Sequence, residues 1–215
     1  MLFLDELPEF HPQVLDALRQ PLETGETVIA RANHRISYPS RIQLIAAMNP
    51  CRCGRAGEPG YACRQGRGCA ERYQARISGP MLDRIDLQIE VPAVSAADLV
   101  LPQASEGSAE VRGRVTAARR AQSERYAALG LLRIRTNAEC DGALLEEIAA
   151  PNRAGLTLLR EAADALSLSA RGYHRTLRVA RTLADLDGED KVARIHIAEA
   201  LSYRGETLRR AQAAA

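Results

Sequence analysis

The chain has 215 residues, enough to bury one good hydrophobic core plus a small second domain. Its net charge of +2 excludes a polycation, and with aromatics at 4% the core must be built from Leu, Ile, Val and Ala. No segment approaches the ~18 uninterrupted apolar residues of a membrane span. With no signal peptide either, we expect a cytoplasmic protein, in which the cysteines are thiols or metal ligands.

The chain opens on a strand pattern. Residues 2–5 form an apolar run that ends in the adjacent carboxylates of Asp5 and Glu6. Such a buried strand is typical of the Walker B element of P-loop ATPases, where the first acid holds Mg²⁺ and the second polarises the attacking water. The phosphate-binding pattern G-x-x-x-x-G-K-[ST] occurs nowhere in these residues, and the only lysine is Lys191. The sequence therefore predicts the second half of an ATPase site without the first.

Two further β patterns follow the first strand. A short helix that begins at Pro12 leads to β-like runs at 28–31 and 35–38, which predict a hairpin. Residues 42–48 then predict a second buried strand, which ends at Asn49.

A Gly- and Cys-rich insert without periodicity occupies residues 51–69. It carries four cysteines, which are Cys51, Cys53, Cys63 and Cys69. Four thiolates on such a loop can close a tetrahedral Zn²⁺ site of structural type, and reduced thiols are the alternative. A short helix around 70–76 and a third strand over 85–91 are predicted to follow.

The second half of the chain has helical patterns throughout. Residues 93–108 are rich in Ala, Ser and Pro and predict a linker. Four helices are predicted after it, at about 108–129, 151–166, 169–186 and 196–209, with Ser108 and Ser169 as N-caps. The predicted organisation is an α/β domain over 1–95 and a helical domain, with its linker, over 96–215.

Four motifs in a fixed order carry a resemblance to a known family. They are LFLDELPEF (2–10), AAMNPCRCG (46–54), RISGPMLDRIDL (76–87) and SARGYHRTLRVARTLADL (169–186). The chain closely resembles the magnesium-chelatase-like AAA+ ATPases, in the YifB/ComM competence-associated branch. The resemblance implies a partial AAA+ P-loop NTPase sheet, with Walker B, sensor 1 and arginine-finger strands, followed by an all-helical lid. Family members carry a long N-terminal domain and a Walker A loop before these motifs, so we expect a truncated chain, a broken gene or a misplaced start codon.

The resemblance also implies roles for single residues. Asp5 is the Walker B ligand of Mg²⁺, and Glu6 is the base that orients the attacking water. Asn49 resembles sensor 1, whose amide can donate to the γ-phosphate. Arg84 resembles the arginine finger that acts on a neighbouring subunit's γ-phosphate; an ion pair with Asp83 or Asp86 is the alternative.

Two further groups of basic residues are candidates for ligand contacts. Arg171 resembles the sensor 2 arginine, which reaches from the lid to the nucleotide, with Arg175 as the second choice and a solvated basic face as the alternative. At the tip of the predicted hairpin, Arg31, His34 and Arg35 could contact nucleic-acid phosphates. A plain exposed hairpin is the alternative there.

The implied activity is ATP hydrolysis with Mg²⁺ in a ring, expected to be a hexamer, that drives DNA translocation or branch migration during DNA uptake and recombination. One alternative is a chelatase-type ATPase subunit for insertion of Mg²⁺ into a porphyrin. Another is a non-catalytic interaction fragment that supplies an arginine finger in trans. Because the central strand of an AAA+ sheet is missing, we expect the isolated chain to bind ATP poorly and to be unstable or self-associating.

Overall fold

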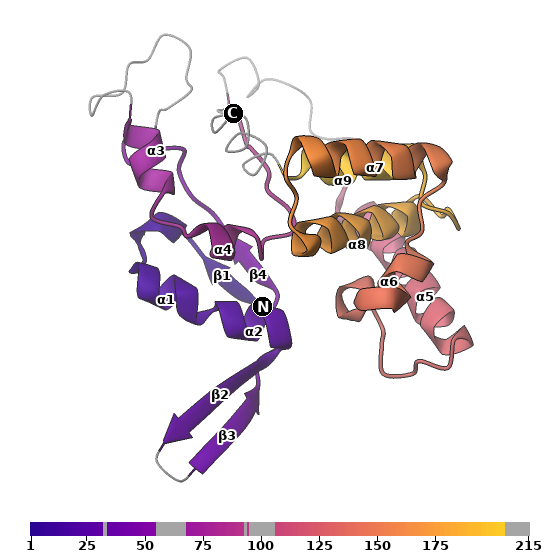
Figure 1. Cartoon of the computed structure of the whole chain (residues 1–215), viewed down its shortest axis with the longest axis horizontal. Helices are drawn as coiled ribbons and strands as arrows, with labels where there is room; N and C mark the ends of the chain where they lie inside the picture. The colour runs from indigo at the N-terminus through magenta and orange to yellow at the C-terminus, as the bar shows by residue number, and fades with distance from the viewer. Residues whose placement is uncertain (32–33, 55–67, 93, 95–105, 205–215) are drawn as a thin grey trace. The chain divides into compact units, whose positions relative to one another are not determined.

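The chain consists of two compact units, Met1–Ile85 (unit 1) and Asp86–Ala215 (unit 2). The computed structural model describes residues 1–31, 34–54, 68–92, 94 and 106–204 of them (Figure 1). The predicted domain boundary at 95–96 lies outside the described residues. None of the helices in the described ranges combines the length and hydrophobicity that crossing a membrane requires.

A parallel pair of strands forms the centre of unit 1. β1 (Leu2–Leu4) pairs with β4 (Leu44–Ala46), with Leu2 opposite Leu44 and Leu4 opposite Ala46. Just beyond the strands, the Leu7 amide donates to the Ala47 carbonyl at 3.0 Å. Both strands lie where the sequence predicts them, and their chains leave the sheet at the same edge.

Only one face of this strand pair is buried, which corrects our prediction of two buried strands. Leu4 and Leu44 pack against the core of unit 1, which comprises Leu7, Leu15, Ile77, Met81 and Leu82. On the other face Phe3 is 59% exposed and Ile45 is 42% exposed. A parallel strand becomes fully buried only where layers cover both of its faces, and in the described part of unit 1 one face is uncovered.

The segment 85–91 forms no strand, so our prediction of a third strand there is wrong. Its side chains Ile89 and Val91 are 69% and 82% exposed. The Gln88 amide donates to the Tyr203 carbonyl at 2.7 Å, whereas none of the described strands pairs with the segment. A β-type pattern becomes a strand only where a neighbour satisfies its backbone groups.

Short helices and one hairpin complete unit 1. They are η1 (Leu7–Glu9), α1 (Pro12–Ala17), α2 (Arg19–Thr24), β2 (Glu26–Arg31), β3 (His34–Pro39), α3 (Cys69–Gln74) and α4 (Gly79–Leu82). The predicted helix at Pro12 and the predicted antiparallel hairpin are confirmed. Figure 1 shows β2 and β3 as a ribbon that extends away from β1 and β4. Ser78 caps α4 by accepting from the Met81 amide, and it donates to Asp16 at 2.9 Å, which ties α4 to α1.

Unit 2 is helical. Its elements are α5 (Ser108–Ala128), η3 (Asn137–Glu139), α6 (Gly142–Ile148), α7 (Arg153–Ala165), α8 (Ala170–Leu186) and α9 (Arg194–Ser202). The four predicted helices are present; the predicted end of the last one lies outside the described residues. Ser169 caps α8 as predicted, accepting from the Gly172 amide at 3.0 Å. The N-cap of α5 is Gly107 rather than Ser108. Leu, Ile, Val and Ala dominate the core, as the composition predicts.

A buried polar network lies among these helices. The side chain of Asp185 is fully buried and accepts hydrogen bonds from Arg125, Arg181 and Asn137. Asn137 in turn accepts from the Tyr126 hydroxyl at 2.9 Å. Burial lowers the pKa of Arg181, and the adjacent carboxylate opposes that shift. The network therefore joins α5, η3 and α8 through a single carboxylate.

We expect Asp185→Asn to destabilise unit 2 by roughly 3 kcal/mol, because it leaves the buried Arg181 without a counter-charge. Urea unfolding followed by the helical circular dichroism signal measures this loss. Asp164→Asn, at an exposed position of α7, is the matched control and should change little. A loss below about 1 kcal/mol for Asp185→Asn would show that the network contributes little to stability.

Candidate functional site

The two predicted catalytic acids lie in an exposed loop directly after β1. We call residues 5–9, which include η1, the acidic loop; Asp5 and Glu6 are exposed in it, whereas Leu7 and Pro8 are buried. The Glu6 amide donates to Asp5 Oδ1 at 2.9 Å, which orients the first carboxylate. Exposed carboxylate oxygens are the ligands that Mg²⁺ prefers, so this loop suits a hydrated Mg²⁺ ion.

Glu6 has an unusual backbone. Its φ of 50° and ψ of 46° place it in the left-handed region, which favours glycine. Holding a side chain with a Cβ atom there costs about 1 kcal/mol or more. Strain of this kind gathers at functional sites, and here it lies at the residue predicted to orient the attacking water.

Asn49 is exposed three residues beyond the end of β4. Because β1 and β4 are parallel, the segment that carries Asn49 leaves the sheet at the same edge as the acidic loop. The strand register thus brings Asp5, Glu6 and Asn49 to one edge of unit 1.

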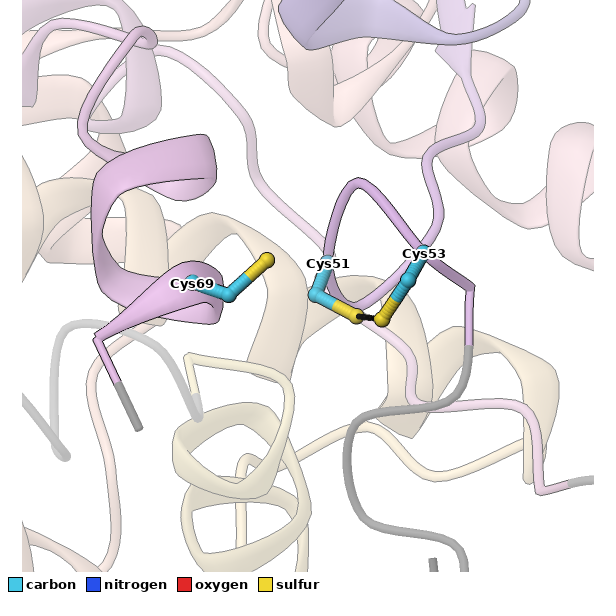
Figure 2. Close-up of side chains that lie close together, drawn as sticks. All are labelled: Cys51, Cys53 and Cys69. Atoms are coloured by element: carbon cyan, nitrogen blue, oxygen red, sulfur yellow. Dashed lines mark hydrogen bonds between the residues drawn. The ribbon is translucent and has the colours of Figure 1, made fainter. Parts of the chain in front are cut away.

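Three of the predicted metal ligands lie together. The Sγ atoms of Cys51, Cys53 and Cys69 all lie within 4.8 Å of one another, and we call them the thiol cluster (Figure 2). The Cys51 and Cys53 sulfurs are 2.9 Å apart, and no disulfide joins the cysteines of the described residues. The fourth predicted ligand, Cys63, lies outside the described residues.

The thiol cluster fits a zinc ion. A tetrahedral Zn²⁺ ion with Zn–S bonds of about 2.3 Å requires sulfurs about 3.8 Å apart, which a small adjustment of these three side chains would provide. Cys51 and Cys69 are buried at 0% and 3% exposure, so a bound ion would be shielded from water on that side.

Arg84, the predicted finger, is held within unit 1. Its guanidinium is 5% exposed, pairs with Glu23 of α2 and donates to the Pro80 carbonyl at 2.7 Å. An ion pair with Asp83 or Asp86 was the alternative that the sequence suggested, and the structure pairs Arg84 with Glu23, 61 positions earlier. Only the fold could reveal a partner so distant in the sequence.

The predicted sensor 2 residues lie on α8 in unit 2. Arg171 is exposed in the first turn of the helix. Arg175 is buried and donates to Asp86 at 2.5 Å, while Arg178 donates twice to the Cys140 carbonyl. The three arginines therefore do not share one solvated face, and Arg171 is the exposed member of the set.

The hairpin presents its basic residues to solvent. Arg31, His34 and Arg35 are exposed, and residues 32–33 between them lie outside the described part. A cavity of about 520 Å³ in unit 2 is lined by Arg153, Thr157, Glu161, Arg194 and two apolar neighbours. None of the predicted site residues lines it.

Tyr73 is a buried residue near the acidic loop that the sequence did not single out. It is 5% exposed, and its pKa is raised, mainly by burial and further by the charges of Glu9 and Glu6. A tyrosine on a six-residue helix offers no sequence signal for such a position, which depends on how α3 packs.

The chain matches two family models that together cover most of its length. Residues 1–99 match the model of magnesium chelatase, subunit ChlI, and residues 105–204 match that of the ChlI C-terminal region. These matches define the class as α/β in the first part and helical in the second, with the magnesium chelatase type of AAA+ ATPase as the family.

Similar curated proteins support the same family assignment. The chain is 45% identical over 215 residues to competence protein ComM of Haemophilus influenzae (95% of this chain, 38% of that protein). It is 42% identical to an uncharacterized protein of Mycobacterium tuberculosis (98% and 41%) and 41% identical to the uncharacterized protein YifB of Escherichia coli (95% and 39%). The chain therefore spans about two fifths of the length of these relatives. It belongs to the magnesium-chelatase-like AAA+ family, together with ComM and YifB.

Replacing the strained Glu6 by glycine should stabilise unit 1 by about 1 kcal/mol, because glycine adopts the left-handed conformation without strain. Glu6→Ala removes the same carboxylate but keeps the Cβ atom, so it should give no such gain. Hydrogen exchange of the amides in residues 2–10 measures both effects. Equal stability of the two variants would contradict the strain at Glu6.

Proposed function

We propose that this chain carries the magnesium and water half of an AAA+ ATPase site. The observation that supports it best is the parallel register of β1 and β4, which directs the acidic loop and Asn49 to one edge. In this proposal Asp5 holds Mg²⁺, Glu6 orients the water that attacks the γ-phosphate, and Asn49 donates to that phosphate. The bound Mg²⁺ supplies charge neutralisation on the phosphate oxygens.

Arg84 is proposed to complete the site of a neighbouring subunit in a ring, which we expect to be a hexamer. A guanidinium bonds carboxylate and phosphate oxygens in the same forked geometry, so Arg84 can exchange Glu23 for a phosphate. Arg171 is the proposed sensor 2 residue because it is the exposed arginine on α8, and Arg175 is its alternative.

We propose that ATP hydrolysis moves DNA, by translocation or branch migration. Support comes from the name of one relative, competence protein ComM, and from the exposed basic residues Arg31, His34 and Arg35 of the hairpin. Insertion of magnesium into a porphyrin is the alternative that the name of the family model suggests. A cytoplasmic location stays a prediction.

The thiol cluster is proposed to bind a structural Zn²⁺ ion. Cys51, Cys53 and Cys69 would supply three thiolates, and the ion would fasten the segment after β4 to α3. For the chain as a whole, the alternative is a non-catalytic interaction fragment that supplies Arg84 in trans to a neighbouring subunit.

Calorimetric titration of Mg-ATP into the 215-residue chain tests the half-site directly. We expect no detectable binding, because the acidic loop alone offers no phosphate cradle. Binding at micromolar concentration would overturn this, since it would require a phosphate cradle elsewhere in the chain.

Turnover is tested in a chain extended to the length of its relatives. There Glu6→Gln should keep Mg-ATP binding but slow hydrolysis by about 10²-fold or more, and Arg84→Ala should slow it by about 10³-fold. Arg160→Ala, at an exposed position in unit 2, is the control. Undiminished hydrolysis in Glu6→Gln would refute the assignment. Stimulation by DNA rather than by porphyrin would favour DNA as the substrate.

A further inference from the structure

Helix α3 connects two parts of unit 1 that the sequence keeps far apart. We propose that α3 is a brace through which metal occupancy of the thiol cluster fixes the acidic loop, with Gln74 and Arg76 as positioning residues. The inference rests on the proposed function only where it gives the acidic loop a catalytic role.

The first end of the brace is the thiol cluster itself. Cys69 is the first residue of α3, and its side chain faces Cys51 and Cys53 on the loop that follows β4 (Figure 2). A metal ion shared by these sulfurs would join the start of α3 to the segment that begins two residues after Asn49.

The second contact lies at the other end of the helix. Gln74, the last residue of α3, donates from Nε2 to the Pro50 carbonyl at 3.1 Å. Pro50 directly follows Asn49, so the two ends of α3 hold the same short segment at two points, one through sulfur and one through an amide.

The third contact reaches the acidic loop. Arg76, just beyond α3, donates from Nη1 to Glu9 Oε2 at 3.1 Å. Between these contacts Tyr73 is 5% exposed, and its pKa is raised by burial first and then by the negative charges of Glu9 and Glu6. The acidic loop, the Asn49 segment and the thiol cluster therefore all contact α3 or the two residues directly after it.

Of the three contacts, the metal site is expected to contribute most to the order of the acidic loop. Arg76 and Glu9 are 37% and 41% exposed, and such pairs contribute little by themselves. Thiolates bind a structural metal ion far more tightly, and the binding free energy becomes folding free energy of the segment that is bound. The turn continues past α3, since the Ala75 amide donates to the Glu71 carbonyl at 2.8 Å and the Arg76 amide donates to the Tyr73 carbonyl at 3.3 Å. We therefore expect order imposed at Cys69 to reach Arg76.

The test uses the whole 215-residue chain, reduced and freed of metal, with Co²⁺ and then Zn²⁺ as probes. Thiolate-to-cobalt charge-transfer absorption reports binding at the cluster, and hydrogen exchange with mass spectrometry reports order along the chain. We expect the metal to slow exchange by about tenfold in residues 4–10 as well as in 51–54 and 68–76.

Variants distinguish metal binding at the thiol cluster from the proposed transmission of order through α3 to the acidic loop. In the double variant Gln74→Ala with Arg76→Ala, the cobalt spectrum should persist while residues 4–10 no longer respond to metal. Exchanging the charges, with Arg76→Glu and Glu9→Arg together, should restore the response that Arg76→Glu alone removes. Glu71→Gln, at an exposed position on the same helix, should behave as the parent chain does.

Three outcomes would overturn the proposal: no thiolate absorption with cobalt, metal-dependent protection confined to 51–54 and 68–76, or an unchanged response in the double variant. No nucleotide enters the experiment, so its result is independent of ATP hydrolysis. A chain in which metal orders the acidic loop but which, at full length, hydrolyses no ATP would support the brace and refute the proposed function.

Discussion

The backbone hydrogen bonds between β1 and β4 determine where Asp5, Glu6 and Asn49 lie. Parallel pairing sends both chains out at the same edge, and the further bond from Leu7 to Ala47 extends the register into the loops. A shift of one residue would turn Leu4 and Leu44 away from the core, so burial of these side chains holds the register. The acids and Asn49 owe their common edge to two leucines that take no part in the chemistry.

Local signals in the sequence were sufficient for elements whose cause is local. Pro12 begins a helix because its fixed φ suits the first turn. Ser169 caps α8 because its hydroxyl accepts a hydrogen bond from the Gly172 amide, which has no partner within the helix. The segment 85–91 fails for the opposite reason: its apolar pattern is of β type, but a strand depends on a partner that no local pattern specifies. The identity of the residues at the candidate site could be predicted from motifs, whereas the strain at Glu6 could not, because it arises from the path that packing imposes on the loop.

For charged side chains too, the sequence reveals the local spacing, whereas the partners depend on packing. Arg181 and Asp185 are four residues apart on one helix, a spacing that a sequence can reveal, yet their burial with Arg125 and Asn137 depends on how α5 and η3 pack against α8. Arg84 has the chemistry of a finger in any context, but its pairing with Glu23 shows that the side chain is already paired within its own chain. In the proposed finger role Arg84 would have to leave Glu23 to reach a phosphate, so its action would depend on the position of α2, which the motif alone does not indicate.

The two units differ in how they achieve stability, and the difference bears on where the site lies. Unit 2 has a helical core with a buried hydrogen-bond network around Asp185. Hydrogen bonds in such a network are strong because water is excluded, and all of its members belong to unit 2 itself. In its described residues unit 1 has a small core, a strand pair with the exposed side chains Phe3 and Ile45 on one face, and loops joined by contacts between partly exposed groups. Weakly held segments open at low free-energy cost, so they respond to whatever binds them. Because the acids, Asn49 and the thiol cluster lie in unit 1, we expect their geometry to respond to partners and ions that bind there.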